Sequence, residues 1–200
     1  MKALVNVFLL FLMVSCNDSP DVLVSPLPIS LEDKAKYLFA IESRLAYVLS
    51  SEDEVVFFNI LPNSIDEFKT LFYSKYNFKD GRNLYLSSDY HFGIILPNLY
   101  HIEEEDVIDK LLNISIGSKW EADAIAVLQK CIQLYFAKNV DESCSQFDRL
   151  TKEEIISFWY FYFDGPHPES YEADFEVLNV RYAAKNERIA RLMTEAYDKL

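Results

Sequence analysis

Two residues whose side chains could transfer protons follow the most aromatic stretch of the chain. Six consecutive aromatic residues, 158 to 163, run directly into Asp164, and His167 follows between two prolines. A carboxylate that orients an imidazole is a common acid–base pair, and loops between helices often carry functional groups. Asp164 and His167 are therefore candidate catalytic residues of a hydrolase, or part of a small-ligand site together with neighbouring tyrosines.

The same corner also has a purely structural interpretation. Gly165 can adopt the left-handed conformation that ends a helix, and Pro166 cannot continue one. Asp164 and His167 would then satisfy polar groups at the turn. Because the sequence offers no third member of a catalytic triad, it favours the structural interpretation and a protein without enzymatic activity, but leaves the question open.

Two tyrosines of the aromatic stretch could serve a partner instead of a substrate. Tyrosine joins an apolar ring to a polar tip, so the hydroxyl groups of Tyr160 and Tyr162 can point to polar edges or to another protein. Together with Asp164 and His167, they are the candidate partner-binding residues.

Cys131 and Cys144 are the cysteines of the body of the chain. In an exported protein, a disulfide between a helix at Cys131 and a loop at Cys144 could form. It would close a loop of about 13 residues and stabilise the fold by roughly 3 kcal/mol. Alternatively, Cys131 is a small buried apolar residue and Cys144 has no partner. The sequence leaves both alternatives open.

No metal or cofactor site is expected. His101 lies beside the acidic run 103–106, but consecutive acidic side chains fan around a helical turn instead of converging, and they suit a helix N-terminus. His91, in an apolar stretch, is expected to pack or to be surface polar rather than to catalyse. The chain also lacks the GxSxG, HExxH, Walker and GxGxxG motifs.

Helix start signals decide the fold class. A Ser or Thr followed three residues later by Glu satisfies orphan backbone donors only where a helix begins. Four such capping boxes occur, and they pair Ser51 with Glu54, Ser64 with Glu67, Ser118 with Glu121 and Thr151 with Glu154. Ser30 followed by Asp33 is an acidic variant. The sequence therefore predicts an all-α protein.

We expect a single irregular domain over residues 31–200, with about seven to eight helices judged from apolar periodicity. These expected helices cover 31–49, 51–60, 64–76, 103–112, 119–138, 151–163 and 171–200. The segment 84–96 could be helical or form at most a minor strand pair.

The aromatic stretch is expected to be the centre of this domain. Consecutive residues of a helix lie about 100° apart, so six aromatic side chains in a row cannot share one face. The helix 151–163 therefore needs neighbours on most sides. Phe158, Trp159, Tyr162 and Phe163 are expected to be its most buried members.

The charge of the chain limits its partners. Half of the residues are apolar and four are glycine, which indicates a folded protein. With 19 basic and 32 acidic residues, the net charge is -13, which opposes nucleic-acid binding. The same charge suits electrostatic attraction to a basic protein partner.

The first residues resemble the signal peptide of bacterial lipoproteins. Lys2 precedes an apolar run that is too short to span a bilayer, and Met13-Val14-Ser15-Cys16 resembles a lipobox. The resemblance covers only these residues. It implies a signal peptide over 1–15, a lipidated Cys16 and a flexible tether over 16–30. Two acyl chains would anchor the protein in the bacterial cell envelope, facing the periplasm or the surface.

Three functions are compatible with these features. The favoured one is a membrane-anchored acidic helical lipoprotein that acts as a protein-binding module, similar in class and charge to immunity or inhibitor proteins. One alternative is an envelope hydrolase or small-ligand-binding protein that uses the corner of Asp164 and His167. The other is a structural envelope lipoprotein without enzymatic activity.

Overall fold

The described part of the protein is built from helices and loops. The computed structural model describes residues 29–42, 49–73 and 84–200, and these contain no β-strand. The α-helices are α2 (Leu31–Glu42), α3 (Ser51–Ile60), α4 (Ile65–Phe72), α5 (Glu104–Ser115), α6 (Ala124–Lys138), α7 (Val140–Phe147), α8 (Lys152–Phe163), α9 (Glu172–Ala183) and α10 (Glu187–Tyr197). Shorter helical turns are η2 (Leu84–Ser87), η3 (Asp89–Ile95), η4 (Leu96–Asn98) and η5 (Pro168–Tyr171). The predicted all-α fold is confirmed.

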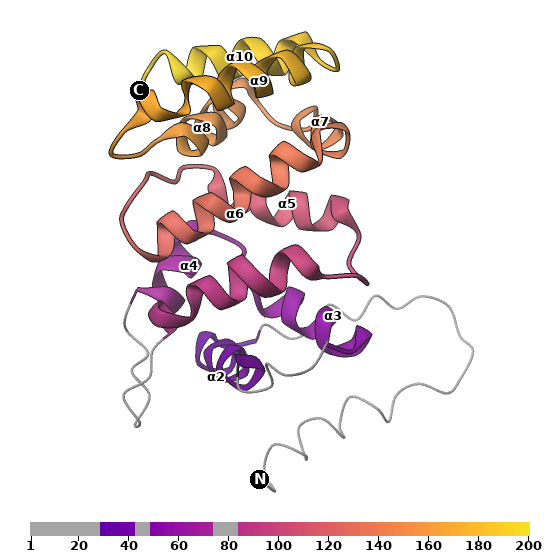
Figure 1. Ribbon diagram of the computed structural model, residues 1–200. Coiled ribbons are helices and arrows are strands. Elements are labelled where there is room, and N and C mark those ends of the chain that lie inside the picture. Colours follow the sequence, from indigo (N-terminus) through magenta and orange to yellow (C-terminus); the bar gives the residue numbers. More distant parts are fainter. Residues whose placement is uncertain (1–28, 43–48, 74–83) are drawn as a thin grey trace, which may run out of the picture.

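The helices form a stack. Figure 1 shows α2 and α3 at one end, α9 and α10 at the other, and α6 crossing the middle. The buried apolar side chains from α2 to α10 form one cluster, so a single core runs through the stack. No helix among the described residues is long and apolar enough to cross a bilayer. The expected signal peptide, Cys16 and most of the tether lie outside the described residues.

Most predicted helix starts are confirmed by their hydrogen bonds. Thr151 and Glu154 form a complete capping box before α8, with the Thr151 N–H donating to Glu154 Oε2 over 2.8 Å. The hydroxyl oxygen of Ser64 accepts the N–H of Glu67 at the start of α4. Ser30 accepts the N–H of Asp33 in the same way at the start of α2.

Two predicted starts are wrong in position. Ser50, not Ser51, caps α3, because its hydroxyl oxygen accepts the N–H of Asp53. Ser118 caps no helix, since its hydroxyl donates to the carbonyl oxygen of Ile114 over 2.8 Å and so serves the end of the preceding helix. Helix α6 consequently begins at Ala124, later than expected.

The ambiguous segment 84–96 contains no strand pair. It winds as a 3-10 turn, a π-helix and a second 3-10 turn. Leu84 is buried and Leu86 exposed, an alternation that a tight helical turn produces as well as a strand. His91 lies between two carbonyl oxygens, with Nδ1 2.8 Å from that of Ser87 and Nε2 3.0 Å from that of Leu38, and the neutral imidazole can donate to one of them.

The described residues contain nine α-helices, more than the seven to eight expected. The expected helix 171–200 is divided into α9 and α10, because the Asn186 side chain caps a new helix by accepting the N–H groups of Arg188 and Ile189. Residues 140–147 form α7 where a loop around Cys144 was expected.

The aromatic helix α8 has the central position that the sequence predicted. Phe158, Trp159 and Phe163 are fully buried, and Tyr162 is 4% exposed. Phe161 is also fully buried, which was not expected. Trp159 packs against rings from other helices, with its centroid 5.3 Å from that of Phe147 and 5.0 Å from that of Tyr182. The aromatic stretch therefore fills the core from several sides.

Two glutamines of α6 satisfy the buried end of α8. The carbonyl groups of a last helical turn have no partner within their own helix. Gln129 Nε2 donates to the carbonyl oxygens of Phe161 and Asp164, each over 2.6 Å. Gln133 Nε2 donates to that of Tyr162 over 2.8 Å. These bonds hold α6 across the end of α8.

His91 should make the stability of the fold depend on pH. Burial lowers the pKa of this imidazole, although the carbonyls of Leu38 and Ser87 and the charge of Glu42 oppose that shift. The folded chain therefore binds the proton less readily than the unfolded chain, whose histidines titrate near pH 6.5. Stability contributed by neutral His91 is present above about pH 6.5 and is lost as the pH falls below it. Denaturant unfolding of wild type and His91→Gln at about pH 7.5 and about pH 5.5 measures this, with a smaller loss expected in the variant. An equal loss in both proteins would contradict the assignment.

Candidate functional site

Asp164 acts as an anchor for a neighbouring loop. It follows the last residue of α8, and its Oδ2 accepts the backbone N–H of Trp120 over 2.8 Å. Its own carbonyl oxygen accepts the Gln129 side chain. The carboxylate is thus committed to holding the segment after α5 against the end of α8.

His167 has a different environment. Its side chain is 76% exposed, and its Nδ1 lies 3.3 Å from Glu169 Oε1. No hydrogen bond or ion pair joins His167 to Asp164 among the described residues, and neither residue lines the two grooves described below. The structure therefore does not assemble the acid–base pair, and the contacts of Asp164 favour the structural interpretation of the corner. The expected left-handed Gly165 is wrong, because α8 ends in the extended backbone of Asp164 and Gly165 has no positive φ.

The two candidate tyrosines separate into a core residue and a surface residue. Tyr162 donates its hydroxyl to the Gln133 carbonyl oxygen over 3.0 Å, and burial raises its pKa well above the usual range. Tyr160 is half-buried and lines a groove. Of the two, Tyr160 is the one that a ligand or partner can reach.

Cys131 and Cys144 are free thiols on α6 and α7. Burial raises the pKa of Cys131 to about 12 and that of Cys144 to about 11. Thiols with such pKa values are almost entirely protonated near neutral pH, so neither is poised as a nucleophile. The buried position of Cys131 fits its interpretation as a small apolar core residue.

His101 belongs to a buried carboxylate clamp. Glu54 of α3 is 1% exposed, and its Oε2 accepts the backbone N–H groups of Tyr100 over 2.8 Å and of His101 over 2.7 Å. The His101 Nδ1 lies 3.3 Å from the same oxygen. No group of three metal-binding side chains occurs in the described ranges. Glu54 instead pins the loop between η4 and α5 onto α3.

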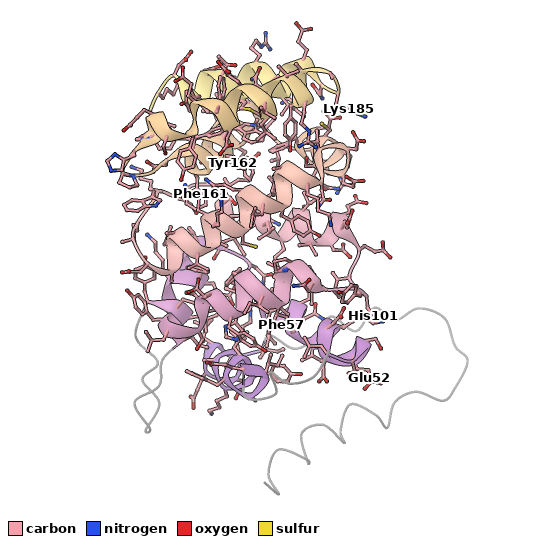
Figure 2. All side chains as sticks on the ribbon, in the orientation of Figure 1. Glu52, Phe57, His101, Phe161, Tyr162 and Lys185 are labelled. Carbon is pink, nitrogen blue, oxygen red and sulfur yellow. The ribbon has the colours of Figure 1, made fainter. Side chains whose placement is uncertain are left out.

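This pinned loop exposes an aromatic ring, and acidic residues follow it in the sequence. Tyr100 is 75% exposed. The neighbouring Glu103 and Asp106, and Glu52 on α3, form no ion pair within the described part of the chain. Figure 2 shows Glu52 and His101 on the same side of the molecule. We call Tyr100, Glu103 and Asp106, which lie in this loop and in the first turn of α5, the acidic loop.

An open apolar groove lies between η3 and η4 on one side and α6 on the other. It has a volume of about 340 Å³. Its lining includes Phe92, Gly93, Pro97, Val127, Cys131 and Leu134, with Asp89 and Lys130 as its charged members. Ile94 is 56% and Leu134 is 59% exposed. We refer to this groove and the acidic loop together as the docking face.

The docking face was not identified from the sequence. Leu134 has a spacing that fits the apolar face of α6, but it is exposed. Tyr100 carried no pattern of its own. The only sequence signal was the acidic run 103–106, which correctly marked the start of α5.

No protein-family model matches the chain, and neither curated proteins nor solved structures give a match.

The clamp should be essential to the order of the acidic loop. Replacing Glu54 with Ala removes two hydrogen bonds from a carboxylate to partly buried N–H groups, so we expect a loss of about 3 kcal/mol in the free energy of unfolding. Glu52→Ala is the matched control, because this exposed glutamate lies in the same helical turn and has no described partner. Its effect should stay within about 0.5 kcal/mol. Similar unfolding curves for the two variants would show that the clamp contributes little.

Proposed function

We propose that this protein is a protein-binding module that recognises a basic partner through the docking face. Two observations support this function: an open groove with apolar lining between η3, η4 and α6, and the exposed Tyr100 with the acidic residues that follow it in the sequence. The proposal makes the chain similar in class and charge to immunity or inhibitor proteins.

The apolar part of the docking face supports binding. Exposed large apolar residues are normal when scattered, but a groove with exposed residues on its walls is typical of an interaction site. Leu134 lines the groove from α6, the exposed Ile94 follows the lining residue Gly93 in the sequence, and Tyr100 follows η4 by two residues. Tyrosine is enriched among the residues that dominate interface energies. We therefore assign Tyr100 as the aromatic anchor.

The charge of the face indicates the chemistry of the partner. Glu103 and Asp106 have no cation to neutralise them in the described part of the chain, so a partner can supply one. The net charge of -13 would also steer a basic protein toward the molecule. Such steering raises the rate of association more than it raises affinity.

The first residues give this module a location. A lipidated Cys16 and its tether would hold the helical stack at a membrane of the bacterial cell envelope, where two acyl chains anchor stably. The proposal thus combines the lipoprotein-like leader with a binding face on the domain. If the leader is interpreted correctly, the Cys16→Ala variant should not be lipidated. Cell fractionation should then find it as a soluble protein or as an unprocessed chain, and not as a mature membrane-anchored protein.

Capture of the partner tests the proposed function. The full chain serves as bait in envelope extract at low salt with crosslinking, and the bound protein is quantified. Tyr100→Ala should reduce capture by about tenfold or more, because truncating an interface anchor costs at least about 2 kcal/mol.

Val180→Ala is the matched control for that experiment. Val180 is 69% exposed on α9, at the end of the stack and away from the docking face. It should leave capture unchanged. Equal losses in both variants, or recovery of the bait alone, would argue against this face as the binding site.

A further inference from the structure

A second groove collects positive charge in an otherwise acidic protein. It has a volume of about 420 Å³ and lies between α8, α10 and the segment that follows α5. It is lined by Gly117, Ser118, Lys119, Lys152, Glu153, Ile156, Ser157, Tyr160, Glu195 and Lys199. Its three lysines and two glutamates give the lining a net charge of +1, in a chain whose net charge is -13. It shares no residue with the docking face.

Two packed helices build most of this groove. Lys152, Ile156 and Tyr160 are spaced four apart along α8, so they lie on one face of that helix. Glu195 lies in the last turn of α10, and Lys199, four residues later, follows the helix by two residues. Helices α8 and α10 pack side by side near one end of the stack (Figure 1). The lysines therefore converge because of the core packing.

The third wall is a loop fixed at two points. The N–H of Gly117 donates to the Ser157 hydroxyl oxygen over 2.8 Å, and the N–H of Trp120 donates to Asp164 Oδ2 over 2.8 Å. Gly117 also has a φ of 78°, which lets the chain turn directly after α5. Lys119 lies between these two anchors. Asp164, a candidate catalytic residue from the sequence, thus positions Lys119.

The groove holds hydrogen-bond donors that its own residues do not use. Glu195 accepts from Lys152 over 2.8 Å and from Lys199 over 3.4 Å, and Lys152 lowers the pKa of that carboxyl most. Each ammonium group has three donors, so both keep donors for a ligand. Lys119 has no ion pair and the Tyr160 hydroxyl has no hydrogen bond among the described residues.

We propose that this groove binds a phosphoryl group, carried by a small molecule or by a lipid headgroup. Lysine ammonium groups act as point charges toward phosphate, whereas a planar carboxylate is matched better by the fork of arginine. The Ser157 hydroxyl receives a hydrogen bond from Gly117 and can donate its own proton to a phosphoryl oxygen. The half-buried Ile156 and Tyr160 provide an apolar surface for the uncharged part of the ligand.

Two probes test this site on the purified full chain at constant ionic strength. The first is inorganic phosphate, followed by amide chemical shifts of Gly117 and Lys119. The second is sedimentation with vesicles of phosphatidylglycerol, compared with phosphatidylcholine. We expect saturable binding of at least one probe, and binding should weaken by about tenfold in Lys119→Gln and in Lys152→Gln, since each removes a charge at ion-pair distance.

Lys36→Gln is the control of equal charge change. Lys36 is exposed on α2 at the other end of the stack, so binding should be unaffected. Phosphate binding alone would assign the ligand as a small molecule, and vesicle binding that is lost in Lys119→Gln would assign it as a headgroup. Absence of saturable binding to both probes, or binding that all three variants leave unchanged, would overturn the proposal.

Discussion

The end of a buried aromatic helix is the constraint on which the rest of this structure depends. The last carbonyl groups of helix α8 are buried in the core. A buried acceptor without a hydrogen-bond partner costs about 1–3 kcal/mol of stability. Gln129 and Gln133, one turn apart on α6, donate to the carbonyls of Phe161 and Tyr162 and to that of Asp164 directly after the helix. The Tyr162 hydroxyl returns a bond to the Gln133 carbonyl oxygen. The two helices are therefore held in one register.

That register also places the docking face. Val127 and Gln129 are two residues apart and so lie about 200° apart around α6, on opposite faces of the helix. One face donates to α8 while the other lines the apolar groove against η3. The same crossing helix thus joins the aromatic core to the surface that we propose binds a partner. The hydrogen bonds to α8 are enough to explain the position of α6.

The sequence predicted what local chemistry determines and missed what distant packing determines. The capping box of Thr151 and the burial of α8 on most sides follow from residues near one another in the chain. The capping role expected of Ser118 failed, because its hydroxyl serves the helix before it. Leu134 fits a core spacing, but η3 and α6 leave it exposed, and Asp164 meets Trp120 only because the fold brings them together.

Replacing Gln129, whose side chain donates to two carbonyl groups, tests most directly whether the fold depends on these hydrogen bonds. Gln129→Met keeps the length and helix preference of the side chain but cannot donate, so it should lower the free energy of unfolding by about 3 kcal/mol. Gln133→Met, which loses a single donor contact, should cost about half as much. Denaturant unfolding of both variants measures this difference. If Gln129→Met unfolds like the wild type, the bonds between α6 and the end of α8 are not what the fold depends on.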